Sequence, residues 1–123
     1  MKDISDTLKY KDVEYKLVFD LNVMEELQEK YGTFDKWCDE AYGKNTGEPS
    51  IKALAFVITA MINEGIEIEN EDSGMELKKP ITTRKANRIL SELAREIGLS
   101  NIVNKIDKVM TNSLQGGENS KNE

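Results

Sequence analysis

Carboxylates are the most numerous side chains in this sequence that could do chemistry. Three groups of them stand close together along the chain: Glu25 with Glu26, Asp39 with Glu40, and the run from Glu67 to Asp72. Paired carboxylates act as general acids and bases, and clustered ones bind Ca²⁺ through their oxygens. The segment 67–76 contains oxygen donors and Gly74, but it lacks the twelve-residue pattern of a calcium loop. We therefore expect a solvated acidic loop there, and we expect no metal and no cofactor.

Groups for nucleophilic catalysis are scarce. The 123 residues contain no histidine and one cysteine, Cys38. Without histidine there is no His base, no Ser–His–Asp triad and no His metal ligand, and a single cysteine forms no internal disulfide. Cys38 stands at helical spacing from Phe34 and Ala41, which predicts a small buried side chain. No glycine-rich phosphate-binding motif occurs, so we expect that the protein is not an enzyme.

Charge bears on the choice of partner. Lys and Arg number 17 against 23 Asp and Glu, a formal net charge of −6. An acidic chain is a poor binder of phosphates, so we do not expect nucleic acid as a partner. Cations are nevertheless concentrated in one segment, at Lys78, Lys79, Arg84, Lys85, Arg88 and Arg95. This segment could meet an acidic partner or nucleic acid, although a solvated helix face is the simpler interpretation.

Periodicity predicts the elements that must position these residues. Apolar alternation indicates a hairpin over 6–10 and 13–20, with Lys11 and Asp12 at the turn. Helical spacing predicts helices over 21–31, 34–42, 51–64, 81–97 and 99–115. The expected N-caps and glycine stops are Asp20 or Asn22, Thr33, Ser50, Thr82 or Thr83, Gly32, Gly43, Gly65 and Gly98.

These elements imply an α+β fold, mainly α-helical, in which an N-terminal β-hairpin packs on four to five helices. A lone hairpin is marginal in water, so its apolar face has to pack on the helices or on another chain. We expect a single domain over residues 1–115 and a flexible polar tail over 116–123.

Two features are candidates for binding a partner. The last predicted helix carries an apolar stripe, which either completes the core or lies in a partner's groove. The hairpin leaves a strand edge that could pair with another chain, including a second copy of this one. The predicted partner-binding residues are Ile102, Val103, Ile106, Val109 and Met110 on the helix, and Tyr10 and Tyr15 on the hairpin.

The order of these motifs resembles the tail assembly chaperones of long-tailed phages and of prophages in Gram-positive bacteria. That family begins with an aromatic-x-Leu-x-Phe/Tyr strand, an Asp, and a helix ending in Glu-x-x-x-Gly. The matching residues are Tyr15, Leu17, Phe19, Asp20 and Gly32, with Glu29 slightly closer to the glycine than in the family. The family's middle helix resembles Ala53–Gly65, and its following segment resembles Ile81, Thr82, Ile89 and Leu90. The likeness covers residues 10–95 and consists of residue classes, with no catalytic signature.

The resemblance implies a non-enzymatic protein that binds the tape measure protein, keeps it soluble and recruits tail tube subunits. Such a protein works in the cytoplasm of the bacterial host and is not expected in the finished virion. The sequence itself contains no signal peptide and no apolar run of about 20 residues, the length that spans a membrane.

Two other functions stay open. The segment 95–101, REIGLSN, resembles the turn of a helix-turn-helix regulator, although only Lys105 and Lys108 follow it as cations. A small metal-dependent enzyme that uses the acidic loop is the second alternative.

Overall fold

The computed structural model describes residues 7–115 and contains one two-stranded sheet and five helices in that range. The predicted fold class is confirmed, because the chain is mainly helical and its hairpin is N-terminal. The predicted tail, 116–123, lies outside the described residues. The elements in chain order are β1 (Thr7–Tyr10), β2 (Val13–Lys16), α1 (Leu21–Tyr31), α2 (Phe34–Ala41), α3 (Ile51–Ser73), α4 (Thr83–Ile97) and α5 (Leu99–Gln115).

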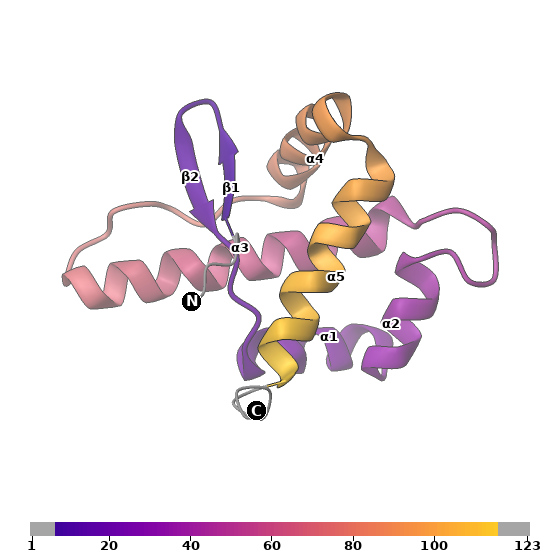
Figure 1. Ribbon diagram of the computed structural model, residues 1–123. Coiled ribbons are helices and arrows are strands. Elements are labelled where there is room, and N and C mark those ends of the chain that lie inside the picture. The colour runs from indigo at the N-terminus through magenta and orange to yellow at the C-terminus, as the bar shows by residue number, and fades with distance from the viewer. Residues whose placement is uncertain (1–6, 116–123) are drawn as a thin grey trace, which may run out of the picture.

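The helix α3 runs through the middle of the molecule (Figure 1). The hairpin and α4 lie on one side of it, α1 and α2 lie on the other, and α5 crosses in front. The first half of α3 is apolar nearly all round, as expected of a helix that is covered on several sides. Its buried residues there are Ala53, Leu54, Ala55, Val57, Ile58, Ala60, Met61 and Ile62.

Side-chain caps begin four of the helices where the sequence predicts them. The N-caps of α1 to α4 are Asp20, Thr33, Ser50 and Thr82, and each side-chain oxygen accepts a backbone N–H three residues further on. The other candidate for α1, Asn22, lies inside the helix and donates its Nδ2 to Glu64 Oε2 at 3.0 Å.

The predicted end of α3 at Gly65 is wrong, and so is most of the predicted acidic loop. The helix continues to Ser73 and ends at Gly74, whose φ of 76° is the left-handed conformation of a C-cap glycine. Gly65 is buried, and a Cβ there would lie 2.5 Å from the backbone oxygen of Lys16. The glycine is therefore a contact point where the chain leaving β2 crosses α3, and it does not end the helix.

The hairpin consists of two four-residue strands and a tight turn. Its strands pair antiparallel, with Leu8 opposite Tyr15, and a two-residue turn joins them. Lys11 and Asp12 in that turn have φ values of 49° and 67°, the left-handed region that such a turn requires. The second strand ends at Lys16 rather than near residue 20. Beyond it the chain stays on α3, because Val18 N–H donates to the Met61 carbonyl at 3.3 Å.

Candidate docking surfaces

The apolar face of α5 belongs to the core. Ile106 and Val109 are 1% and 4% exposed, and Ile102 and Met110 are buried as fully. Val103 is half-buried and packs against the same core. The prediction that these five residues bind a partner is therefore corrected in favour of the other alternative, that the helix completes the core. The physical reason is that α5 covers the apolar sides of elements that would otherwise face water.

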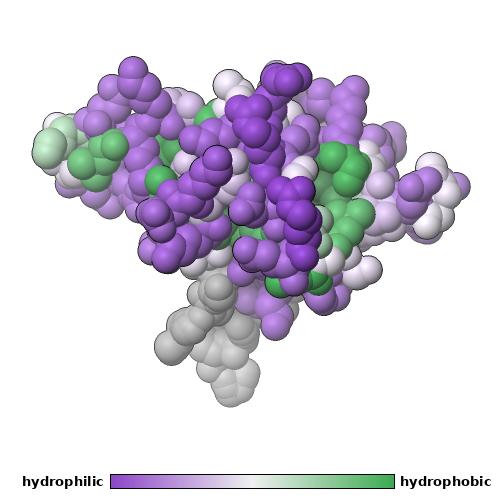
Figure 2. All heavy atoms as spheres, turned by 90° about the horizontal axis from the view of Figure 1, so that it is seen from above, coloured by the Kyte–Doolittle hydropathy of each residue, from purple (hydrophilic) through white to green (hydrophobic). Residues whose placement is uncertain are grey.

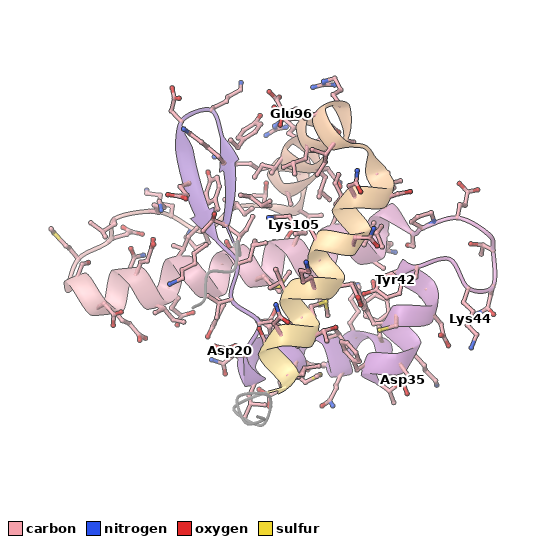
Figure 3. The ribbon with its side chains drawn as sticks, in the orientation of Figure 1. Asp20, Asp35, Tyr42, Lys44, Glu96 and Lys105 are labelled. Atoms are coloured by element: carbon pink, nitrogen blue, oxygen red, sulfur yellow. The ribbon has the colours of Figure 1, made fainter. Side chains whose placement is uncertain are left out.

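A hydrogen bond fixes α5 beside α2. The hydroxyl of Tyr42, just after α2, donates to Asp107 Oδ1 on α5 at 2.8 Å. Figure 3 shows Tyr42 reaching from α2 toward α5. Burial and this bond raise the pKa of Tyr42 above its usual value, so its hydroxyl keeps the donated proton. We call the contact of α5 with α2 around Tyr42 and Asp107 the α5 seam.

The two tyrosines predicted on the hairpin edge have different positions. Tyr15 is 4% exposed, and the Nζ atoms of Lys78 and Lys85 lie 5.9 and 5.8 Å from its ring centroid. Its ring is thus covered, which corrects its prediction as a free contact residue. Tyr10 is half-buried at the tip of the hairpin and lines a groove. On the outer edge of β2, Lys78 Nζ donates to the Glu14 carbonyl at 3.1 Å, so a second chain would meet a partly occupied edge.

The groove beside Tyr10 is basic. It has a volume of about 460 Å³ and lies between the hairpin tip and α4. Its lining consists of Tyr10, Lys11, Arg84, Asn87, Arg88, Ser91, Glu92 and Arg95, and we call it the basic groove. The arginines recur at intervals of four and seven residues, which places them along one face of α4. Seen from above, the hairpin and α4 present a largely hydrophilic surface (Figure 2).

A second hollow of about 370 Å³ continues this surface, because Arg88 lines both. Lys78, Lys79 and Lys85 line it together with the edge of Tyr15. All six cations of the predicted basic segment therefore line one or both of these two hollows. Lys11 from the hairpin turn joins them, a contribution that no pattern in the sequence predicts.

One polar atom of the basic groove lacks a partner. Asn87 Oδ1 is buried and makes no hydrogen bond among the described residues. A buried acceptor without a donor costs about 1–3 kcal/mol.

Another hollow has the opposite charge. It has a volume of about 850 Å³ and lies between the end of α1, α2 and the loop that follows α2. Its charged lining residues are Lys36, Asp39, Glu40 and Glu48. The Tyr31 hydroxyl is buried in the same region without a hydrogen-bond partner, and burial followed by the charge of Glu40 raises its pKa. The predicted carboxylate pair Asp39–Glu40 thus lines an open acidic hollow.

The far end of α3 is acidic as well. The exposed carboxylates there are Glu67, Glu71 and Asp72 on the helix and Glu76 just after it, and we call the segment 67–76 the acidic end. Met75 and Leu77 beside them are 61% and 54% exposed, and Figure 2 shows hydrophobic surface at that end of the molecule. Glu69 differs from its neighbours, because it pairs with Lys78 Nζ at 3.1 Å.

Cys38 and the clustered carboxylates are the groups that the sequence offers for nucleophilic catalysis and metal binding. Burial, and then the charges of Asp107, Asp35 and Asp39, raise the pKa of Cys38 to about 11. Its thiol is therefore neutral near pH 7 and a weak nucleophile. Between residues 7 and 115, no three His, Cys, Asp or Glu side chains are grouped so that they could hold a metal ion. None of the helices there combines the length and apolar content that crossing a membrane requires.

Comparison with known proteins adds no relative. No protein-family model, no curated protein and no solved structure matches this chain.

Proposed function

We propose that this chain is a non-enzymatic assembly protein of the phage tail assembly chaperone type, which binds a tape measure protein and recruits tail tube subunits. One observation carries the proposal. The residues behind the resemblance form a connected unit, in which Leu17 and Phe19 follow Tyr15 into the core. Directly after them Asp20 caps α1, and Gly32 closes the helix at a φ of 94°. The pattern therefore describes a strand, a crossing and a capped helix.

The exposed surfaces support docking of proteins. The basic groove and the acidic end offer charge to a partner, and an exposed charged contact is reversible and depends on salt. Reversibility is what a chaperone requires, since it has to leave its partner when assembly is complete. The net charge of −6 would help to keep such a complex in solution. Because α5 is part of the core, the contact with a partner falls to the hairpin, α4 and the end of α3.

Co-expression tests the proposal. The full chain is produced with the tape measure protein of the same tail gene cluster, and in parallel with an unrelated long coiled-coil protein of similar length. We expect a larger soluble fraction of the tape measure protein and a complex in a pull-down, with no effect on the coiled-coil control. An equally insoluble tape measure protein and an empty pull-down would contradict the proposal.

A DNA-binding regulator is the alternative, and the arginines along one face of α4 favour it. Two features give it less support. Only Gly98 separates α4 from α5, whereas a helix-turn-helix turn has 3–4 residues. The apolar side of α5 is in the core, and of the two lysines that follow the turn Lys108 is exposed and Lys105 half-buried. A gel shift with duplex DNA that weakens steeply with salt would favour this alternative.

A further inference from the structure

The hairpin and α4 collect positive charge on a chain that is acidic as a whole. The basic groove and the second hollow, which share Arg88, are lined by seven of the 17 Lys and Arg residues. Among the described residues of that lining, Glu92 is the only carboxylate. Cations gathered in one place on a chain with a net charge of −6 are complementary to an anionic group that reaches into the groove.

Two arginines of the groove are not neutralised by their own chain. Arg84 and Arg88 are exposed, and neither forms an ion pair with a carboxylate within residues 7–115, whereas Arg95 lies 3.7 Å from Glu92. Arg84 and Arg88 stand one turn apart on α4, which is about 6 Å along the helix axis. A guanidinium group binds a carboxylate through two parallel N–H···O bonds. The two arginines therefore offer sites for two carboxylates about 6 Å apart.

The second hollow adds apolar surface beside these arginines. Its lining includes Val13, Tyr15 and Ile81. Val13 is 36% exposed, although it is an aliphatic side chain on the hairpin. Covering such a side chain with an apolar group of a partner removes it from water and is favourable. A partner therefore gains from combining carboxylates with an apolar side chain.

The aromatic rings of this region are less suited to nucleic acid. Tyr15 is buried, and the Nζ atoms of Lys78 and Lys85 lie 5.9 and 5.8 Å from its ring centroid. Lys11 Nζ lies 5.6 Å from the ring centroid of Tyr10. Single-stranded nucleic acid binds largely by stacking its bases on open aromatic rings, and duplex DNA brings a dense row of phosphates toward a chain that is acidic overall. The surface therefore favours a protein segment that carries a few carboxylates.

We propose that the basic groove and the second hollow together bind an acidic segment of a different protein. Two carboxylates of the segment pair with Arg84 and Arg88, and an apolar side chain packs on Val13 in the second hollow. The inference deepens the proposed function and rests on it only in taking these surfaces to dock proteins. The ion pairs form at the surface, so salt weakens them, whereas salt does not screen the apolar contact.

Selection of short random peptides displayed on yeast tests the proposal, with the full chain as bait at about 0.05 M NaCl. We expect enrichment of peptides that contain at least two Asp or Glu residues and one aliphatic residue. One enriched peptide, labelled with fluorescein, then serves as the probe in anisotropy titrations. Its affinity should fall at least tenfold between about 0.05 M and about 0.5 M NaCl, where charges are screened within a few Å.

Variants of the groove test the two ion pairs. Arg84→Glu with Arg88→Glu should weaken binding of the probe at least tenfold at low salt. The matched control, Lys52→Glu with Lys108→Glu, changes the net charge by the same amount at exposed positions outside both hollows and should leave the affinity unchanged. A probe whose acidic residues are replaced by Lys should bind the variant with two glutamates better than wild type, because the pairing is then reversed.

A variant of the hairpin tests the apolar contact. Val13→Ser should weaken binding of the probe about threefold at both salt concentrations and leave the salt dependence as it is. The control is Leu114→Ser, which removes an exposed aliphatic side chain from α5 and should have no effect. Circular dichroism establishes that each variant is folded.

Three results would overturn the inference: no enrichment of acidic peptides, controls that weaken binding as much as the test variants, or a duplex oligonucleotide that binds the groove more tightly than the probe. The proposed function fails separately, in the co-expression experiment. Groove-dependent binding of the peptide beside an insoluble tape measure protein would remove the function and leave the inference standing. A soluble tape measure protein without groove-dependent peptide binding would do the reverse.

Discussion

The neighbouring helices α4 and α5 make opposite use of the same kind of sequence. Both are amphipathic, and Gly98 alone separates them. The apolar face of α5 disappears into the core, with Ile106 and Val109 almost fully buried. The polar face of α4 stays open and lines the basic groove. In this chain the apolar stripe on α5 therefore indicates a buried helix face. The surface that is available to partners is the charged one on α4.

The two helices also differ in what they contribute energetically. Burying an aliphatic side chain contributes about 1.5–3 kcal/mol to stability. An exposed charge contributes a few tenths of a kcal/mol, and salt screens it. Substitutions on α5 should therefore change the free energy of unfolding, and substitutions on the exposed face of α4 should change the binding of a partner.

The largest effect is expected at the α5 core face. Replacing both Ile106 and Val109 by Ser removes buried methyl groups and places hydroxyls in the core, which should cost about 5 kcal/mol or more. That is comparable with the whole stability of a small domain. Thermal and urea unfolding followed by circular dichroism should show an unfolded or barely folded variant.

The matched comparison is Arg84→Glu with Arg88→Glu on α4, which should shift the free energy of unfolding by less than about 1 kcal/mol. The comparison would fail if the serine variant kept the wild-type melting temperature but lost its partner. In that case the apolar face of α5 would be a docking surface after all.

A second effect is expected where the hairpin meets α3. In Gly65→Ala the new methyl group would meet the backbone oxygen of Lys16 at 2.5 Å, so the chain leaving β2 has to move. The helix gains about 1 kcal/mol of propensity from alanine, but we expect a net loss of about 2 kcal/mol in urea unfolding.

Because the hairpin forms one wall of the basic groove, Gly65→Ala should also weaken the binding of a partner at that groove. The control is Thr111→Ala, which is exposed on α5 and changes propensity without a close contact. A Gly65→Ala variant as stable as wild type would mean that β2 does not rest on α3 at this glycine.

The elements whose local chemistry is self-contained could be predicted from the sequence. Thr33 and Ser50 precede their helices and cap them with their own side chains, so their role does not depend on the rest of the fold. Gly65 could not be interpreted in this way. A glycine at the end of an apolar run usually ends a helix. At position 65 a glycine is required for another reason, because the backbone of Lys16, about 50 residues earlier in the chain, leaves no room for a side chain.

The candidate site was predictable only in part, for a related reason. The cations from Lys78 to Arg95 are visible in the sequence, and four-residue spacing places Arg84 and Arg88 on one helix face. Lys11 lies beside them only because the hairpin packs next to α4. A local sequence pattern does not predict that tertiary arrangement. The apolar stripe of α5 was equally visible, but periodicity does not distinguish a face that meets its own chain from one that meets another.

The smallest effect concerns the chemistry of the α5 seam. Cys38 lies near Asp107, and its pKa of about 11 is raised chiefly by burial. Alkylation by iodoacetamide requires the thiolate, so the rate should reach half its maximum near pH 11 in the folded protein and about two pH units lower in urea. Because the folded state favours the neutral thiol, this group's contribution to stability is complete below pH 9 and is lost as the pH rises toward 11.

Asp107→Asn sharpens the same measurement. The amide oxygen can still accept the Tyr42 hydroxyl, so the seam keeps its hydrogen bond while one negative charge beside Cys38 disappears. The thiol pKa should fall, but it should stay above 9 because burial is its main cause and is unchanged. If the wild-type thiol of Cys38 reacted with the same pH dependence in the folded protein as in urea, α5 would have to detach often from the rest of the fold. The buried face of α5 would then differ from the exposed face of α4 only in how often each is accessible to solvent, because α5 would exchange between a docked and a detached state.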